Sequence, residues 1–491
     1  MSISNNLINR TSFSAADIAT KPPQQPPSSF KIGHLAQSSI ALSALSASLL
    51  HSTQSSPPFS SVSRVSVPLE HALVEFKSER LYDIDKQPLE DPWGSIGGLH
   101  KTADGYVRIH DNFPCHALGT LELLGLPPNA SRQDVAAKVA QWKSVDLETA
   151  GTEKGKLAIY ALRSYSEWDA HPQSAAIDNN PILIRQFAQG PPKNLSTIKS
   201  SSRCLQGIRV LEMSRVIAAP VAGKTLAAHG ADVLWVTSPN LPNQPVLDRD
   251  LSRGKRTIRL DIHNPDEKDR LLELLRTCDV FIQGYRPGSL ASYGFSPEEL
   301  QKINPNIICA NLSAFGPSGP WSQRRGFDSL VQTCSGMNIS EAEHFGAGEP
   351  ARAMPCQALD HAGGYLLATG VMAALYNRSQ VGGSWVVDVS LAGVMKYLRS
   401  LGQYPGKTGF ESQDFVKQAD VPREYFETRD TAFGKMTAVR HSASVEGCEV
   451  GWGGDAETSG IRRSKVVIDL MITHYGIYLK ICTYSPPLMY D

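Results

Sequence analysis

The sequence has no excess of charge of either sign. Its 491 residues include 48 lysines and arginines and 48 aspartates and glutamates, so the formal net charge at neutral pH is zero. Proteins that bind nucleic acid electrostatically carry a clear basic excess, and we therefore expect no nucleic-acid partner. A balanced chain still leaves room for a local basic pocket that binds a phosphorylated ligand.

Long apolar runs and targeting signals are also missing. A membrane-spanning helix needs about 20 consecutive apolar residues, and the closest candidate, residues 466–482, is interrupted by Asp469, His474 and Lys480. The first residues lack the basic stretch and apolar core of a secretory signal, and the last three are no peroxisomal signal. We expect a cytoplasmic protein with no membrane partner.

The eight cysteines include no CxxC pair, and their spacing fits neither zinc-finger ligands nor a dense disulfide framework. We interpret them as free thiols in a reducing compartment. The first half holds His110, His116 and His171 at irregular spacing and outside any HExxH motif. We interpret these as core or surface histidines and expect no metal site.

Composition divides the N-terminal part of the chain. Residues 1–66 are rich in Ser, Pro, Gln and Asn and are expected to be largely disordered, apart from a helix over 35–50 that could dock on the body. Residues 67–190 are expected to fold as a smaller α+β domain, with Asp104-Gly105 as the turn of a hairpin. Apolar spacing in this domain predicts helices over 117–126, 131–142 and 147–161. Residues 191–204 are expected to be a linker.

Short apolar strands alternate with helices over residues 205–400. Strands are expected at 209–212, 232–236, 257–260, 280–282, 307–312 and 385–390. Helices are expected at 220–229, 267–277, 297–303 and 363–377. This alternation predicts an α/β fold with a doubly wound, parallel, Rossmann-like sheet. Ligands of such sheets bind beyond the carboxyl ends of the strands.

Five blocks in this region carry a family signal. They are GIRVLEMSRVIAAPVAGKTLAAHGADVLWV, SRGKRTIRLDIHNP, CDVFIQGYRPGSLASYGFSPEELQKINPNIICANLSAFGPSGP, GFDSLVQTCSGM and ALDHAGGYLLATGVMAALYNRSQVGGSWVVDVSL. In this order they resemble the core of the family III CoA-transferases, also called the CaiB/BaiF family, over about residues 205–400. The resemblance implies an enzyme with no permanently bound cofactor, whose substrates are coenzyme A thioesters. It also implies a homodimer, or a fused pseudo-dimer if the first half of the chain takes the partner's place.

The flanking segments resemble the family less fully. Residues 67–190, through GGLHKTADGYVRIHDNFPCHALGTLELLG and RSYSEWDAHPQ, resemble a partial copy that the long fungal members carry ahead of the main one. Residues 401–454 still resemble the family, through TAFGKMTAVRHSASVEGCEVGW. The tail 455–491 does not, and a misread splice site or a frameshift is our hypothesis for it.

The resemblance implies that Asp360, which opens the segment DHAGG, is the nucleophile. An aspartate is ionised at neutral pH and can attack the activated carbonyl of a thioester, which gives an acyl-aspartyl anhydride and then an aspartyl-CoA thioester. Gly363 and Gly364 are expected to let the thioester approach and to face the developing oxyanion. In the alternative interpretation, Asp360 is only the N-cap of the following helix.

Coenzyme A carries three phosphates, so its site needs cations and amide donors. Basic residues cluster at Arg253, Lys255 and Arg256 and again at Arg324 and Arg325. The resemblance implies coenzyme A contacts at the strand ends, from Ile217, Ala218, Ser238, Leu260, Gly284, Tyr285, Arg286 and Arg325. Two positions depart from the family pattern: many members have Asn in place of Gly284, and the second strand commonly ends in an acidic residue where this chain has Val236-Thr237.

Three functions remain open at this point. The first is an acyl-CoA:carboxylate CoA-transferase, with an acyl-CoA donor and a carboxylic acid acceptor. The second is an α-methylacyl-CoA racemase, but that enzyme uses the His of a Gly-His-Asp triplet where this chain has Gly326-Phe327-Asp328. Phenylalanine cannot take a proton, so racemisation would lack a base. The third is a catalytically silent coenzyme A-binding protein.

Overall fold

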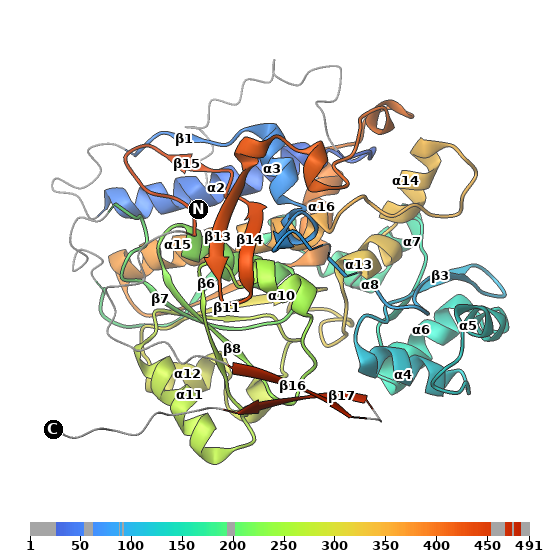
Figure 1. Ribbon diagram of the computed structural model, residues 1–491, viewed down its shortest axis with the longest axis horizontal. Helices are drawn as coiled ribbons and strands as arrows, with labels where there is room; N and C mark the ends of the chain where they lie inside the picture. Colours follow the sequence, from blue (N-terminus) through green and yellow to red (C-terminus); the bar gives the residue numbers. More distant parts are fainter. Residues whose placement is uncertain are drawn as a thin grey trace. The chain divides into compact units, whose positions relative to one another are not determined.

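A seven-stranded sheet forms the centre of the fold (Figure 1). Its strands are β6 (Ile182–Ala188), β7 (Arg209–Met213), β8 (Asp232–Thr237), β9 (Arg256–Arg259), β10 (Val280–Gln283), β11 (Ile308–Ser313) and β12 (Ser384–Ser390). Six strands run parallel in the order β9-β8-β7-β10-β11-β12, and β6 joins the β12 edge antiparallel. The predicted mixed α/β fold with a largely parallel sheet is confirmed.

The computed structural model describes residues 26–53, 62–87, 89–90, 93–193 and 202–452, together with the backbone of β16 (Val467–Thr473) and β17 (Gly476–Cys482). The chain up to Trp452 forms one compact unit, and the residues from Gly453 onward form a second. In the second unit β16 and β17 pair antiparallel. The disorder predicted for residues 1–66 falls in part on 1–25 and 54–61, which lie outside the described residues.

Helices cover both faces of the sheet. The helices α2 (Ile32–Ser52), α9 (Ala218–Ala228) and α15 (Ala358–Val381) lie on one side, and α11 (Pro265–Thr277) and α12 (Pro297–Ile303) lie on the other (Figure 1). Alternate residues of β10 enter two different cores, Ile282 with the first group and Phe281 with the second. Burial on both faces explains why β10 is apolar over Val280, Phe281 and Ile282.

The helix predicted over 35–50 is present as α2, and it packs along α15. Ala36, Ile40, Ala44 and Ala47 are all fully buried. Small side chains at this helical spacing allow two helices to pack closely together. The N-terminal helix is therefore part of the main core.

The first half folds around a small sheet of β3 (Gly98–Lys101), β4 (Tyr106–Ile109) and β5 (Ile159–Ala161). The hairpin predicted at Asp104-Gly105 joins β3 to β4 and is confirmed. The helix predicted over 147–161 is wrong at its end: α6 (Ser144–Thr149) continues only as a wider turn over Ala150–Lys154, and Ile159–Ala161 pairs with β4. Lys156, with a φ of 51°, lies between the two elements, and a left-handed backbone ends a helix.

The remaining elements complete the compact unit. The helices are α3 (Leu69–Glu75), α4 (Pro114–Leu123), α5 (Arg132–Val139), α7 (Tyr165–Asp169), α8 (Pro172–Ala175), α10 (Pro245–Leu251), α13 (Asp328–Cys334), α14 (Met337–Phe345) and α16 (Leu391–Ser400). The strands are β1 (Val65–Ser66), β2 (Asp83–Ile84), β13 (Phe426–Thr431), β14 (Gly434–Val439) and β15 (Ser444–Val445). Because β1 pairs with β15 and β2 with β14, the two ends of this unit are joined. Among the described residues, no helix has both the length and the apolar character to cross a membrane.

Candidate active site at the start of helix α15

Asp360 lies in the first turn of α15, which begins at Ala358 after Gln357 as its N-cap. The helix is capped from outside by Asp328, whose Oδ2 accepts hydrogen bonds from the backbone N–H groups of Leu359 at 2.8 Å and Asp360 at 3.1 Å. The N-cap alternative for Asp360 is therefore wrong, because Asp328 carries out that role.

The carboxylate of Asp360 has no hydrogen-bond or ion-pair partner within the part of the chain that the structure describes. It is half-buried. Burial and the nearby negative charges of Asp328 and Glu79 raise the pKa of Asp360 well above its usual range. A carboxyl group held in such an environment is a candidate for a reactive rather than a structural role.

Glu79 and Arg80 bring the first half of the chain to this site. They belong to a short 3-10 helix, Ser78–Arg80. Glu79 Oε2 lies 2.9 Å from Nε2 of His361, and its Oε1 accepts from Nε of Arg80 at 3.1 Å. Arg80 also donates to the side chain of Gln357 at the start of α15. No motif marks these residues in the sequence, so only the fold identifies them.

Phe327 occupies the position at which the racemases have a histidine. Its ring stacks on that of His110, with 3.8 Å between centroids and 10° between planes, and it also contacts Phe113 and His116. Burial lowers the pKa of His110 to about 3 and that of His116 to about 4. Both imidazoles are therefore neutral near pH 7, and both pack against the aromatic ring of Phe327. This packing agrees with the interpretation of His110 and His116 as core histidines.

Arg108 is a third residue that sequence reasoning missed. It lies on β4, two residues before His110 and so on the same face of the strand, which is the face packed against Phe327. The guanidinium is half-buried and makes no hydrogen bond or ion pair within the described residues. Burial lowers the pKa of Arg108, and the negative charge of Asp328 opposes that shift. A desolvated cation without a partner is a candidate binding group for a carboxylate.

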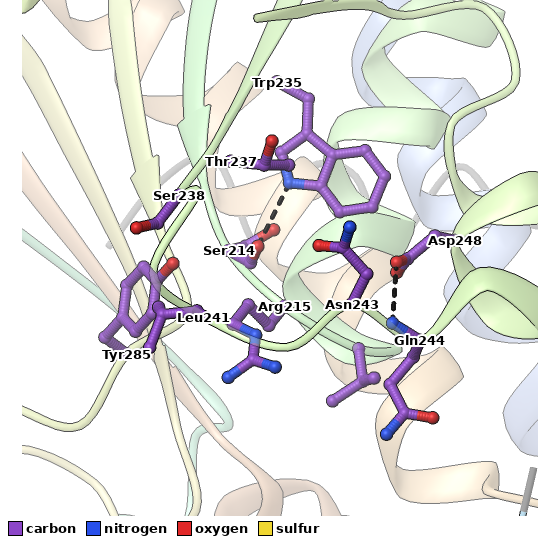
Figure 2. Close-up of a pocket in the computed structure, with 11 residues that line it drawn as sticks. Ser214, Arg215, Trp235, Thr237, Ser238, Leu241, Asn243, Gln244, Asp248 and Tyr285 are labelled. Atoms are coloured by element: carbon purple, nitrogen blue, oxygen red, sulfur yellow. Dashed lines mark hydrogen bonds between the residues drawn. The ribbon is translucent and has the colours of Figure 1, made fainter. Parts of the chain in front are cut away.

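Several of the predicted coenzyme A contacts meet at the carboxyl ends of β7, β8 and β10. Ser238 and Tyr285 line one side of a pocket there, and Gln244 and Asp248 line another (Figure 2). Ile217 is the N-cap of α9 and Ala218 is its first residue, and both are buried. Leu260 packs its side chain into the core on the α11 side, so a ligand at this edge of the sheet would meet only its backbone.

Gly284 connects β10 to this pocket at a point of close packing. A Cβ atom at this position would lie 2.7 Å from Cβ of Ala219 and 3.2 Å from Cβ of Ser214. Any side chain would therefore push β10 away from the start of α9. This contact explains why glycine is present where many family members have asparagine.

Arg286 and Arg325 lie close enough to repel one another. Burial and the charge of Arg286 lower the pKa of Arg325. Arg325 donates to the backbone oxygen of Lys156, and neither guanidinium forms an ion pair among the described residues. Arg286 is exposed and lines a second cavity of about 180 Å³, next to Gln283 and Asn311. Two neighbouring cations without an anion form a candidate phosphate site.

The other basic residues considered for phosphate binding are held in ion pairs. Lys255 pairs with Glu212 at 2.9 Å, with both side chains fully buried. Arg253 pairs with Asp250 and Glu427, Arg256 with Asp232, and Arg324 with Glu148 and Glu153. These carboxylates neutralise the four residues, which leaves Arg286 and Arg325 as the better candidates for phosphate binding.

The roles expected for Gly363 and Gly364 also change. Both residues are buried inside α15, so their N–H groups belong to the helix and do not face a ligand. A Cβ on Gly364 would lie 2.5 Å from both the backbone oxygen of Ala218 and Cβ of Val221. This glycine therefore allows α15 to pack against α9, and it does not open a path for the thioester.

The chain is an α/β protein with a candidate nucleotide site. This site consists of the pocket at the carboxyl edge of the parallel sheet and the nearby guanidinium groups of Arg286 and Arg325. More particularly, the chain belongs to CoA-transferase family III, whose family model matches residues 205–451.

Similar proteins include the acetyl-coenzyme A transferase nodX of Hypoxylon pulicicidum, 28% identical over 67% of this chain and 58% of that protein. A formyl-CoA:oxalate CoA-transferase of Rhodopseudomonas palustris is 35% identical over 40% of this chain and 49% of that protein. A crystal structure of a hypothetical protein from Mycobacterium tuberculosis aligns at 33% identity and a TM-score of 0.37, over 40% of this chain and 58% of that one. The chain spans about half the length of the first curated relatives it matches.

Proposed function

We propose that this protein is an acyl-CoA:carboxylate CoA-transferase with Asp360 as its nucleophile. The observation that carries the proposal is the unpartnered, half-buried carboxylate of Asp360, placed by Asp328 at the first turn of α15. Family membership supports the same reaction class. The phenylalanine at position 327, stacked on the neutral ring of His110, argues against a racemase, because neither group there can exchange a proton near neutral pH.

The proposed reaction proceeds through four exchanges at one carboxyl group. A carboxylate oxygen of Asp360 attacks the thioester carbonyl, the carbon–sulfur bond breaks, and coenzyme A leaves as a thiolate. The thiolate then attacks the aspartyl carbonyl of the mixed anhydride and releases the donor acid as its carboxylate. The acceptor carboxylate attacks the resulting aspartyl-CoA thioester and expels the thiolate again. Finally the thiolate takes the acceptor's acyl group and frees Asp360, so no net proton is consumed.

The ligands are assigned to the groups that match their charge. Coenzyme A enters at the carboxyl edge between β7 and β10, where the strand order of a doubly wound sheet reverses. Its phosphates lie against Arg286 and Arg325, and its adenine packs on Tyr285 near Ser238. The acceptor carboxylate binds Arg108, the unpaired cation near Asp328. No permanently bound cofactor is needed, and we propose a cytoplasmic homodimer as the working form.

Trapping of the covalent intermediate tests this proposal. The purified protein is incubated with a panel of acyl-CoAs, quenched, digested and analysed by mass spectrometry for a coenzyme A or acyl adduct on the peptide that contains Asp360. The adduct should form in the unaltered protein and disappear in Asp360→Asn. Binding of coenzyme A without any adduct, across the panel and with an acceptor present, would identify a silent binding protein instead.

A further inference from the structure

Three metal-binding side chains from distant parts of the chain meet at one place. His51 lies in the last turn of α2, Cys204 lies just before β7, and Cys448 follows β15. One ligand atom from each, a ring nitrogen and two sulfurs, lie within 4.8 Å of one another. None of these residues belongs to the candidate active site. Sequence spacing did not reveal the group, because 153 and 244 residues separate its members along the chain, from 51 to 204 and from 204 to 448.

The separations fit a tetrahedral zinc ion. Zinc binds sulfur at about 2.3 Å and imidazole nitrogen at about 2.0–2.1 Å, which places two ligands of a tetrahedron roughly 3.5–3.8 Å apart. Nδ1 of His51 lies 3.6 Å from Sγ of Cys448. Closing the widest pair from at most 4.8 Å requires a movement of about 1 Å, which a change of side-chain rotamer can supply.

The surroundings favour a cation bound by thiolates. Cys204 is buried, whereas His51 and Cys448 are half-buried. A divalent ion with two thiolates is neutral overall, and neutrality reduces the cost of burying charge.

The backbone around the three residues is already held in place. The N–H of Glu449 donates to the backbone oxygen of Ser202 at 2.7 Å, and Arg203 donates to the backbone oxygen of Gly451. Val65 pairs with Val445 in the β1–β15 ladder. The segments that carry the ligands are therefore brought together by other contacts, and a metal ion would meet a group that needs little reorganisation.

We propose that His51, Cys204 and Cys448 bind a zinc ion, with a water molecule as the fourth ligand. Two cysteines and one histidine are a ligand set that zinc prefers. The ion would tie the end of α2 and the segment after β15 to the start of the parallel sheet. Bridging positions so far apart in sequence restricts the unfolded chain strongly, so the ion stabilises the fold.

Metal analysis of the full-length protein tests the proposal. After purification under reducing conditions and dialysis, elemental analysis should find about one zinc ion per chain. Substitution by Co²⁺ should give the visible ligand-field bands and the thiolate charge-transfer band of a tetrahedral site with two sulfurs. A chelator should lower the Tm, and zinc should restore it. The Co²⁺ spectrum is recorded on the unaltered sequence, so it decides the matter even if a variant fails to fold.

Variants assign the ligands. Cys204→Ser and Cys448→Ser should each lose the zinc and the chelator-dependent change in Tm, whereas Cys278→Ser, which alters a buried thiol elsewhere, should keep both. Asp360→Asn should bind zinc normally, which separates this proposal from the proposed transferase activity. Zinc content well below one per chain after reconstitution, zinc unaffected by both ligand variants, or a native Cys204–Cys448 disulfide would overturn it.

Discussion

Asp328 Oδ2 accepts a hydrogen bond from the backbone N–H of Asp360 at 3.1 Å, so the carboxylate of Asp328 fixes the position of Asp360. Asp328 is itself held by the side chain of Gln332 and by the N–H of Leu359. Burial raises the pKa of Asp360, and the nearby negative charge of Asp328 raises it further. Asp328 thus both positions the proposed nucleophile and contributes to the shift of its pKa.

Asp360→Asn should abolish acyl transfer while the fold and coenzyme A binding persist. Asparagine keeps the size and most of the hydrogen bonding of the side chain, but it lacks the anionic oxygen that attacks the thioester. We expect turnover to fall by about a thousand-fold or more, as for removal of other covalent nucleophiles. Turnover is measured by exchange of coenzyme A between carboxylates and binding by calorimetry. An active Asn variant would remove Asp360 from the mechanism.

Asp328→Asn should shift the pH dependence of transfer toward lower pH. Transfer requires ionised Asp360, so the rate rises with pH through the pKa of that group. The charge of Asp328 raises this pKa, and its removal lowers it, while the asparagine oxygen still accepts the N–H groups of α15. Rates are recorded from pH 4 to 9, with Asp169→Asn as a surface control because Asp169 pairs with Arg399. An unshifted profile would place Asp328 outside the electrostatics of the site.

Arg286→Ala and Arg325→Ala should each weaken coenzyme A binding, by roughly 1–3 kcal/mol if the side chain contacts a phosphate. Affinity is measured by calorimetry at two salt concentrations, since loss of a phosphate contact also reduces the salt dependence. Arg256→Ala is the matched control, because Asp232 already pairs with that guanidinium. If both variants bind as tightly as the control, the phosphates lie elsewhere.

Arg108→Ala should raise KM for the acceptor acid, by roughly ten-fold or more for loss of one charge-assisted hydrogen bond, with little change in coenzyme A affinity. Lysine at this position should restore part of the effect, since it keeps the charge but not the planar fork. Arg132→Ala serves as the control, because Arg132 contacts the same hairpin through Leu99. If Arg108→Ala and Arg132→Ala have the same KM for the acceptor acid, Arg108 does not bind the acceptor.

The parts of the fold that depend on local pattern were predictable. Alternating apolar strands and helices gave the parallel sheet, and Asp104-Gly105 gave the hairpin, because short-range periodicity and turn chemistry act within a few residues. The strand at Ile159–Ala161 was missed, since it exists only by pairing with β4. Its apolar spacing alone was compatible with helix.

Residues of the candidate site were predictable where a sequence motif marks them. They were not predictable where the role of a residue depends on partners that are distant in the sequence. Asp360 and the pocket residues Ser238 and Tyr285 followed from the family resemblance. The ion pair of Lys255 could not be predicted, because its partner Glu212 lies 43 residues earlier. The sequence suggested a chemical role for Gly364, because the packing of this residue against α9 cannot be read from the sequence alone. Single-sequence reasoning also has no means to find an unpaired arginine such as Arg108, since the lack of a partner is a property of the fold.

The packing of α2 along α15 bears on how this chain tolerates shortening. Proteolytic clipping after residue 53 that released α2 would uncover the face of the 24-residue helix that carries Asp360. An exposed apolar face of that size promotes self-association. A product that had lost α2 would therefore be prone to aggregate.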